Sequence, residues 1–532
     1  MNEMLIDLSG RRLLSLCAPL QAVCLCLLCL GLLGFVAPAG RAQQPRQNVK
    51  SGQRYARIVI RNATVVDGNG TPAAGPKDIV IEGNRIAAVV PLDPVAVQSG
   101  TAQRPAGDVE IDATGKYVLP GLINAHAHVQ NERGGVPQPL DYELKLWLAC
   151  GITTVRDLAS DTKITLQLRA DSNAGTTPAP RILIYPNFNE NPTPHTRAEA
   201  QARVRAIKAI GADGIKFFDV DRDIMETMLA EAHTLGLPTA HHAAVAETNA
   251  WDDARFGTTS IEHWYGIPDA ALPSGVQNFP PSYNYNNETD RFRYAGRLWR
   301  EADWDKLMKV LDALVAAHVA WDPTLDIYEA SRDLQRAQTQ PWFADYLHPT
   351  LEAYFRPDPA HHGSYFIGWT STDEVFWREN YRIWMAALRE FDRRGGVIGC
   401  GEDAGFIYQM YGFGLLREME LYQEAGFHPL KVIQQCTGNN AQILGMADRI
   451  GRIRPGYLAD LIVVNGNPLD NLKVLYPVGV DVVRAGQTMH TGGIEWTIKD
   501  GIPYHAPTMF AEVKEMVAKA RAAAPRPTRA PR

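Results

Sequence analysis

The chain has 532 residues and a formal net charge of −6, with 45% hydrophobic and 21% charged residues. These fractions are typical of a globular protein, and the length is sufficient for one large domain and a smaller one. The modest negative charge and the lack of a long basic cluster in the body of the chain argue against nucleic acid as a partner. We therefore expect a small-molecule ligand.

The first part of the chain, residues 1–42, has the pattern of a secretory signal peptide. Two arginines precede an apolar stretch over residues 22–38, and small residues follow up to Ala42. Cleavage after Ala39 or Ala42 predicts a periplasmic or secreted protein without membrane contact. The apolar run is slightly short of the roughly 20 residues that a spanning helix needs, so an uncleaved membrane anchor is the alternative.

Four of the seven cysteines lie in this leader. The other three, Cys150, Cys400 and Cys436, are odd in number and widely spaced, so they predict no disulfide framework even in an oxidising compartment. We expect them to be buried, small apolar side chains.

Short strands are predicted at both ends of the mature chain. Apolar or alternating runs separated by Gly- and Asn-containing turns occur over residues 56–60 and 78–81, and again over residues 459–464 and 481–486. An economical arrangement pairs the two ends in one small β-sandwich domain. The segments of this composite domain are residues 43–118 and 446–505.

Residues 119–445 alternate short apolar strands with helical stretches. Eight candidate strands with intervening helices predict an α/β fold of the (β/α)8 type, a TIM barrel. The candidate strands are residues 122–128, 153–156, 181–185, 214–218, 238–242, 259–263, 319–325 and 397–401. In such barrels the chemistry collects at the C-terminal ends of the strands.

Two stretches exceed what a minimal barrel needs. Residues 266–296 contain paired prolines and several tyrosines, and residues 326–396 are long, aromatic and partly helical. Both stretches follow strand ends, so they could form a lid or a wall of the substrate pocket. The alternative is surface decoration or a dimer contact, and a homo-oligomer is therefore possible. The last residues, 506–532, predict a helix followed by a disordered tail.

The strongest chemical signal is the sequence His126-Ala127-His128 at the end of the first candidate strand. Residues two apart on a strand face the same side, so both imidazoles point one way. Neutral imidazole is a common ligand of zinc and similar divalent metals, and the pair therefore predicts half of a metal site. Further residues that can bind a metal end later candidate strands: Lys216, His242, His263 and Asp403.

These residues lie in motifs that resemble the metal-dependent amidohydrolase superfamily, most closely its binuclear branch of prolidase-like and imidazolonepropionase-like proteins. The resemblance covers about residues 55–490. The motifs that carry it are Pro-Gly-Leu-Ile-Asn-Ala-His-Ala-His at 120–128, Gly-Ile-Thr-Thr-Val-Arg-Asp at 151–157, Ile-Glu-His at 261–263, Gly-Glu-Asp-Ala-Gly at 401–405 and Gly-Arg-Ile-Arg-Pro-Gly-Tyr-Leu-Ala-Asp-Leu at 451–461.

The resemblance implies two divalent metal ions, with zinc as the default and manganese, cobalt or iron as alternatives. The more buried metal would be held by His126, His128 and Asp403. The second metal would be held by His242 and His263.

The resemblance also implies that Lys216 is N-carboxylated and bridges both metals as a carbamate, an anion that two nearby cations favour. His241 and His242 compete for one ligand position, because adjacent strand residues face opposite sides. The family pattern assigns the position to His242, and His241 is then expected to pack against a helix.

The chain departs from the family pattern at two places. Glu402 stands where the family usually has Thr, and Trp264 follows the strand-six His where it usually has Gly. Both departures are expected to alter the pocket wall, so the resemblance does not carry over a substrate preference. Candidate residues for holding a substrate carboxylate or carbonyl are Arg156, His195, Tyr265 and Tyr328. Arg156 has a structural alternative, in which it pairs with Asp157 or a backbone carbonyl.

The resemblance implies a dipeptidase-like amidohydrolase that cleaves amide bonds of peptides or N-acyl amino acids by metal-activated hydroxide, with Asp403 as general base and then general acid. An esterase, lactonase or phosphotriesterase on the same site is an alternative. A mononuclear deaminase is disfavoured, because Val245 stands three residues after His242 where those enzymes have Glu, and because they lack the Lys. A non-catalytic binding protein is disfavoured by the full ligand set, and a serine hydrolase by the lack of a G-x-S-x-G motif.

Overall fold

The computed structural model describes residues 49–243, 247–284, 286–358 and 362–523. All of them belong to one compact unit, residues 45–532. The predicted signal peptide and the predicted tail beyond residue 523 lie outside the described residues. Among the helices that the structure describes, none combines the length and apolar character needed to cross a membrane.

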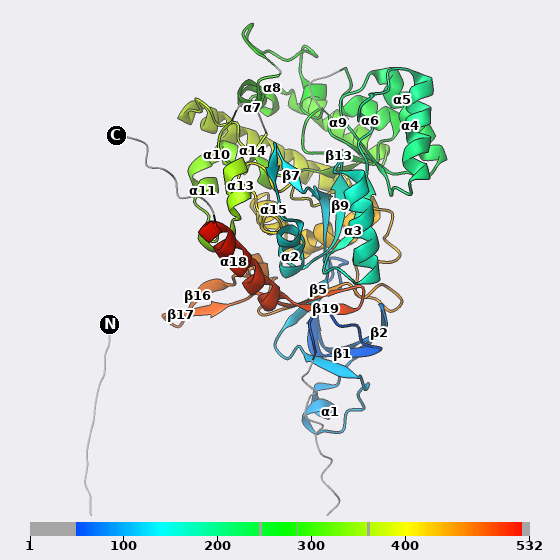
Figure 1. Cartoon of the computed structure of the whole chain (residues 1–532), viewed down its shortest axis with the longest axis vertical. Helices are drawn as coiled ribbons and strands as arrows, with labels where there is room; N and C mark the ends of the chain where they lie inside the picture. Colours follow the sequence, from blue (N-terminus) through cyan, green and yellow to red (C-terminus); the bar gives the residue numbers. More distant parts are fainter. Residues whose placement is uncertain (1–48, 244–246, 285, 359–361, 524–532) are drawn as a thin grey trace, which may run out of the picture. The chain divides into compact units, whose positions relative to one another are not determined.

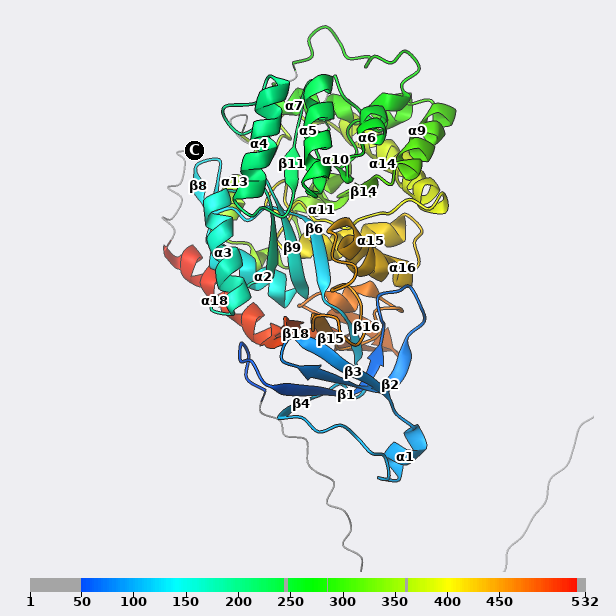
Figure 2. The same cartoon turned by 90° about the vertical axis from the view of Figure 1, so that its right-hand side faces the viewer.

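Strands from both ends of the chain join in one eight-stranded sheet, seen in the lower part of Figures 1 and 2. They are β1 (Arg57–Val65), β2 (Ala74–Glu82), β3 (Arg85–Pro91), β4 (Val109–Asp112), β5 (Tyr117–Pro120), β15 (Leu461–Val464), β18 (Ile494–Lys499) and β19 (Ile502–His505). Their order is β19-β18-β15-β5-β1-β2-β3, and β4 pairs with β1. The antiparallel pairing of β15 with β5 links the two chain ends. The sandwich form of this domain stays a prediction.

Alternating apolar residues explain why these segments are strands. Ile58 and Ile60 of β1, Ile79 of β2 and Val463 of β15 are buried in one apolar cluster. Side chains two residues apart on a strand face the same side, so one face of each strand can supply this cluster.

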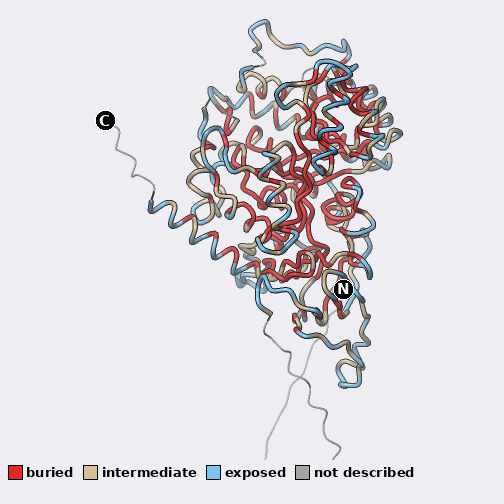
Figure 3. The backbone as a smooth tube through the Cα atoms, turned by 45° about the vertical axis from the view of Figure 1, so that its right-hand side comes forward, coloured by how far each residue is buried: buried red, intermediate tan, exposed pale blue. Residues whose placement is uncertain are grey.

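Seven of the eight predicted barrel strands are present, in two parallel sheets. The first sheet has the order β10-β9-β6, and the second has the order β11-β12-β13-β14. Their bounds are β6 (Leu122–Ala127), β9 (Ile152–Leu158), β10 (Arg181–Tyr185), β11 (Ile215–Phe217), β12 (Thr239–His241), β13 (Ser260–Glu262) and β14 (Ala320–Asp322). Figure 3 shows buried backbone concentrated in the centre of the molecule, and every residue of these strands is buried.

The predicted eighth strand, residues 397–401, forms only one isolated parallel bridge, between Ile398 and Trp321 of β14. The side chain of Asn440 accepts from the backbone N–H of Cys400 at 2.9 Å and donates to the backbone carbonyl of the same residue at 2.8 Å. The side-chain amide thus takes the place of a strand partner at the N–H of Cys400, whereas the carbonyl of Cys400 also accepts from the backbone N–H of Ala125 in β6 at 3.1 Å. A second isolated bridge joins Asn187, which follows β10, to Lys216 of β11, and among the described residues it is the one bridge that links the two parallel sheets. The closed barrel therefore stays a prediction.

Helices separate and cover the parallel strands (Figure 2). Those outside the two predicted insertions are α1 (Pro94–Gln98), α2 (Leu140–Ala149), α3 (Thr162–Ala174), α4 (Arg197–Ala209), α5 (Arg222–Thr234), α6 (Ala250–Phe256), α8 (Leu298–Glu301), α9 (Trp304–Ala316), α15 (Phe413–Glu424), α16 (Pro429–Gln434), α17 (Asn440–Ile443) and α18 (Ala506–Ala523). Reciprocal side-chain to backbone hydrogen bonds between Thr196 and Glu199 begin α4. Two short hairpins complete the described strands: β7 (Glu132–Arg133) with β8 (Val136–Pro137), and β16 (Val480–Arg484) with β17 (Gln487–Thr491).

The two predicted insertions are ordered helical segments packed on the parallel strands. The first contributes α7 (Glu288–Ala295), and the second contributes α10 (Glu329–Arg332), α11 (Leu334–Gln338), α12 (Phe343–Tyr346), α13 (Pro349–Tyr354) and α14 (Ser371–Arg393). Trp377 and Trp384 of α14 are buried, with ring centroids 6.0 and 6.1 Å from that of Trp264. The aromatic residues of the second insertion therefore build core, which contradicts its interpretation as surface decoration.

The prediction for the mature cysteines was wrong for one pair. Cys400 and Cys436 form a disulfide with their Cα atoms 5.0 Å apart, whereas Cys150 is free and buried as expected. Their separation of 36 residues gives no sign of this contact, because folding alone brings residues 397–401 beside the π-helical turn Gln435–Asn439.

We expect Cys436→Ser to lower the free energy of unfolding by about 2–5 kcal/mol, because the disulfide restricts the unfolded chain. Chemical denaturation of the wild type and the variant in oxidising buffer measures the difference. A reductant should lower the stability of the wild type towards that of the variant and leave the variant unchanged. Equal stability of both proteins in oxidising buffer would contradict the structural role of the disulfide.

Candidate metal centre

All six predicted metal ligands line one cavity of about 420 Å³. Five of them lie in or directly after parallel strands, and the sixth, Asp403, follows residues 397–401; the cavity contains His126, His128, Lys216, His242, His263 and Asp403. Short strands with buried side chains hold their C-terminal ends together, so residues far apart in sequence meet there.

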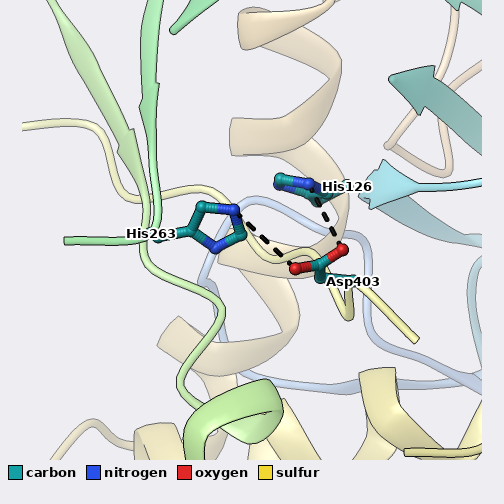
Figure 4. A group of neighbouring side chains, drawn as sticks. All are labelled: His126, His263 and Asp403. Atoms are coloured by element: carbon teal, nitrogen blue, oxygen red, sulfur yellow. Dashed lines mark ion pairs between the residues drawn. The ribbon is translucent and has the colours of Figure 1, made fainter. Parts of the chain in front are cut away.

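The carboxylate of Asp403 lies between imidazoles from different strands (Figure 4). Its Oδ1 is 2.9 Å from Nε2 of His128 and 3.6 Å from Nε2 of His126, and its Oδ2 is 3.7 Å from Nε2 of His263. The ring of His242 lies 4.7 Å from that of His263, measured between centroids. Nitrogen and oxygen donors thus converge on one point, as a divalent metal site requires.

One group of three candidate ligands contains residues that the resemblance assigns to different metals. Ligand atoms of His126, His263 and Asp403 all lie within 4.8 Å of one another. His126 and His263 were expected on different metals, so Asp403 is placed where it can contact both. The assignment of each imidazole to one metal stays a prediction.

Burial keeps the imidazoles neutral, which is the form that binds metals. It lowers the pKa values of His126, His242 and His263 well below the ordinary value, and that of His128 less strongly. Burial alone would raise the pKa of Asp403, but its interactions with His126, with His128 (which includes a hydrogen bond) and with Lys216 outweigh burial, so that the pKa is lowered and the carboxylate is ionised.

Lys216 places a buried amine in the same cavity. Its Nζ has no hydrogen-bond partner among the described residues, and burial lowers its pKa to about 8. A buried amine without a partner is costly, and a neutral one can be modified to an anionic oxygen ligand. The donor set of this cavity, imidazoles with a carboxylate and this amine, therefore fits a divalent metal site.

Two of these residues have a left-handed backbone. φ is +61° at His263 and +43° at Asp403, values that are uncommon for residues other than glycine. His263 directly follows the last residue of β13, so the chain leaves the strand at this position and its ring turns into the cavity. Such conformations cost free energy and concentrate at functional sites.

A fully buried carboxylate supports His126 from behind. Glu262 Oε2 accepts a hydrogen bond from Nδ1 of His126 at 2.8 Å, and Glu262 Oε1 pairs with Arg156 at 2.7 Å and accepts from Ser260 at 2.6 Å. The arrangement fixes Nδ1 as the protonated nitrogen and leaves Nε2 directed at Asp403. The sequence contained Glu262 within a motif, but nothing in the motif assigned it this contact.

Arg156 and His195 do not contact the cavity, and these substrate-binding predictions are corrected. Arg156 is fully buried, where it donates to the backbone carbonyl of Ala125 and pairs with Glu262. Its structural alternative is thus the observed role, with Ala125 supplying the carbonyl. His195 is exposed in the loop before α4, and its backbone N–H caps that helix through Glu199. Neither lines the pocket.

Tyr265 and Tyr328 do line the cavity, as expected. The hydroxyl of Tyr265 is buried without a hydrogen-bond partner among the described residues. Its ring stacks on His242, with centroids 5.5 Å apart, and the ring of Tyr328 lies 5.7 Å from that of His263.

His241 and Glu402 point away from the cavity. His241 stacks on Phe217 with centroids 4.1 Å apart and bonds Asp253 of α6 at 2.8 Å, as the ligand assignment to His242 requires. Glu402 accepts from Trp147 at 2.5 Å and from the backbone N–H of Gly412 at 2.7 Å. The expectation that Glu402 alters the pocket wall was therefore wrong, because its carboxylate is used to hold α2 and the segment before α15.

Sequence reasoning missed the cavity residues from the insertions. From the insertions these are Glu288, Arg291 and Phe292 of α7, Ile327 and His362. A further one, Phe406, follows Asp403 in the chain. Only the polar and aromatic composition of the insertions hinted at them, because their contacts with the cavity depend on the fold.

We expect Glu262→Gln to weaken metal binding about 10- to 100-fold, because His126 loses the carboxylate that orients it. Competition with a chromogenic chelator measures the affinity. Asp253→Asn is the matched control, since Asp253 forms an equally buried carboxylate–imidazole pair at 2.8 Å with His241, outside the cavity. Unchanged affinity in Glu262→Gln, or an equal loss in both variants, would contradict the positioning role.

Comparisons with known proteins find similarity over parts of the chain. Residues 385–501 match the model of the amidohydrolase family. Over 106 residues the chain is 33% identical to a D-hydantoinase from Streptomyces coelicolor, covering 20% of this chain and 21% of that protein. The match thus spans about a fifth of the relative's length.

Two solved structures share the fold over most of the chain. A Xaa-Pro dipeptidase with bound methionine matches with a TM-score of 0.58 and 20% identity, over 84% of this chain and 100% of that one. A bottromycin amidohydrolase matches with a TM-score of 0.61 and 18% identity, over 88% of this chain and 92% of that one. Residues 385–501 thus match the amidohydrolase family, and the chain shares the fold of these two solved structures.

Proposed function

We propose that this protein is a metal-dependent hydrolase that cleaves amide bonds in peptides or N-acyl amino acids. The observation that carries the proposal is the convergence of all six ligand-type side chains on one cavity, with Asp403 between imidazoles of different strands. Relatives named D-hydantoinase, dihydroorotase and adenine deaminase, and a structure named Xaa-Pro dipeptidase, support hydrolysis of carbon–nitrogen bonds.

The cofactors that we propose are two divalent metal ions, zinc by default, with a carbamate on Lys216. Metal ions bound by these residues would activate a water molecule and polarise the scissile carbonyl group. The neutral imidazoles supply donors, and the anionic Asp403 offsets part of the positive charge. Glu262 and Thr324 hold His126 and His263 in orientation, the latter through an Oγ1 to Nδ1 distance of 2.6 Å.

Asp403 is the group that moves the proton. Its carboxylate accepts the proton of the attacking water as the water oxygen bonds to the carbonyl carbon. It then donates that proton to the leaving nitrogen as the carbon–nitrogen bond breaks, and the ionised carboxylate is restored. The low pKa of Asp403 keeps the carboxylate in its accepting form at neutral pH.

Esters, lactones and phosphotriesters are the second class of substrate that this cavity admits, because the same activated water and proton acceptor serve carbon–oxygen and phosphorus–oxygen bonds. Screening the metal-loaded protein against dipeptides, N-acyl amino acids, lactones, esters and phosphotriesters decides between the classes. Faster turnover of amides supports our proposal, and turnover confined to the other classes overturns it.

We further propose that the two parallel sheets are the halves of one eight-stranded barrel and that the protein is periplasmic or secreted. The bridge between Asn187 and Lys216, the backbone hydrogen bonds that join residues 400–403 to β6, and the fold of the solved relatives support the barrel. The charged and apolar pattern of residues 1–42 supports the location.

We expect Asp403→Asn to lower kcat about 10²- to 10⁴-fold on any amide substrate found, because the proton acceptor is lost. Initial rates on the best substrate of the screen measure the effect. Circular dichroism and thermal melting should match the wild type, since the amide keeps the size of the carboxylate. Rates like those of the wild type would remove Asp403 from the mechanism.

We expect carbamate formation on Lys216 to increase with pH through about 8, the pKa of its amine. Below that pH the amine is protonated and cannot attack carbon dioxide, and above it the amine is neutral. Metal-free protein is supplied with zinc and carbon-13-labelled bicarbonate at two pH values, one unit below and one unit above 8. Carbon-13 NMR then measures the amount of carbamate in each sample. Lys216→Met should give no signal, and equal signals at both pH values would contradict the assignment.

A further inference from the structure

Arg133 lies behind the segment that carries Asp403. It ends β7, in the short hairpin that follows β6, and it pairs with Val136 of β8. The side chain is buried, yet it does not line the cavity. A buried guanidinium has lost its hydration, so contacts within the protein must replace the lost water. Those contacts converge on residues 404–411, directly after Asp403.

The guanidinium holds the backbone next to Asp403. Nη2 of Arg133 donates to the backbone carbonyl of Ala404 at 3.0 Å. A Cβ at Gly405 would lie 2.4 Å from the same nitrogen, so only glycine lets the guanidinium lie against the backbone here. φ is +43° at Asp403 and +90° at Gly405, so the chain turns on both sides of the carbonyl that Arg133 binds.

Phe406 connects the same guanidinium to a second candidate ligand. The guanidinium carbon of Arg133 lies 3.9 Å from the centroid of the Phe406 ring, within the range of a cation–π interaction. The Phe406 ring meets the ring of His128 edge to face, with centroids 5.6 Å apart. Arg133 therefore supports Asp403 through the backbone and His128 through an aromatic ring.

Tyr411 and α2 fix the orientation of Arg133. Nε of Arg133 donates to the hydroxyl of Tyr411 at 2.9 Å. The ring of Tyr411 meets that of Trp147 of α2 with centroids 5.8 Å apart, and the indole of Trp147 donates to the carboxylate of Glu402. One buried network thus reaches both the residue before Asp403 and the residue after it.

The position of Asp403 matters more than that of an ordinary buried residue. Its carboxylate is directed between the rings of His126 and His263 (Figure 4), where the proposed reaction needs it to contact metal and move a proton. Its left-handed backbone persists only where surrounding contacts enforce it. A displacement of about 1 Å at a reacting group can lower a rate about 100-fold. Contacts that hold residues 404–406 therefore act on the reaction through Asp403.

We propose that Arg133 is a positioning residue for Asp403, whose guanidinium holds residues 404–406 so that the carboxylate stays directed at the metal centre. The inference rests on the proposed function and adds a residue that contacts neither metal nor substrate. Arg133 lies outside the motifs that carry the resemblance to the superfamily. Because it acts through the backbone after Asp403, its removal lowers metal affinity and kcat together and changes KM little.

The first measurement is zinc affinity, which needs no substrate. Arg133→Met removes the donors and the charge but keeps a long side chain, and we expect it to weaken zinc binding about 10- to 100-fold in competition with a chromogenic chelator. Arg133→Lys keeps a cation beside the Phe406 ring, so it should recover part of that loss. Arg181→Met is the matched control and should bind zinc like the wild type. Arg181 is a buried arginine at the start of β10 that pairs with Asp460 at 2.5 Å and does not line the cavity.

The second measurement separates kcat from KM on the best amide of the substrate screen, at saturating zinc. Arg133→Met should lower kcat about 10- to 100-fold and change KM by less than about threefold, because substrate groups away from Asp403 keep their contacts. Tyr411→Phe should lower kcat by a smaller factor, about threefold, since Nε of Arg133 loses its acceptor. In the double variant, Tyr411→Phe should add nothing to Arg133→Met, because both act through one contact.

Thermal melting separates the positioning role from a general loss of stability. Arg133→Met and Arg181→Met should both melt at a lower temperature, but only the former should lose zinc affinity and kcat. Wild-type zinc affinity or wild-type kcat in Arg133→Met overturns the positioning role, and so does an equal loss in Arg181→Met. If Arg133→Met does not fold, unchanged zinc affinity and kcat in Tyr411→Phe overturn it instead.

Zinc affinity also distinguishes failure of this inference from failure of the proposed function. A loss of zinc affinity confined to Arg133→Met and partly recovered in Arg133→Lys supports the positioning role even where no amide is cleaved. That outcome overturns the proposed amide hydrolysis alone. Cleavage of amides by Arg133→Met at the wild-type rate overturns the positioning role and leaves the proposed hydrolysis intact.

Discussion

The buried ion pair between Arg156 and Glu262 is the interaction on which the metal centre depends. Both side chains are fully buried, so each needs the other to offset the loss of hydration. Arg156 comes from β9 and Glu262 from β13, and Glu262 also holds His126 of β6. One charged network therefore ties both parallel sheets to a single imidazole orientation, and its replacement by apolar residues would leave His126 free to rotate.

The need to hold each imidazole in one orientation also accounts for the short strands. β11, β12, β13 and β14 span three residues each, and the chain leaves β13 through the left-handed backbone of His263. A longer strand would continue the alternation and carry this ring to the other face of the sheet. At Asp403 the left-handed backbone has the same effect after the segment held by Asn440 and the disulfide. Strain at these positions is supported by the packed core around them.

The sequence was sufficient to predict residues whose position depends on local pattern. His126, His128, His242 and His263 each lie at or just beyond the end of a strand, so their meeting follows once the parallel strands are placed. Arg156 could not be assigned from alternation, because β9 is buried on both faces. The disulfide and the contact of Glu288 with His362 join segments far apart in the chain, and no local property of either residue encodes the pairing.

The cavity has two parts that come from different segments of the chain, the candidate metal ligands and the wall formed by the insertions. The parallel strands and residues 397–403 supply every candidate metal ligand, and their geometry is set by backbone pairing and by the network of Arg156. The insertions supply Arg291, Phe292 and His362, whose positions depend on packing between α7 and the segment before α14. Because the candidate metal ligands and these wall residues come from different segments of the chain, the wall can change its charge and shape while the ligands stay the same. The same fold is shared by solved structures named for different reactions, a Xaa-Pro dipeptidase and a bottromycin amidohydrolase, as such separation allows.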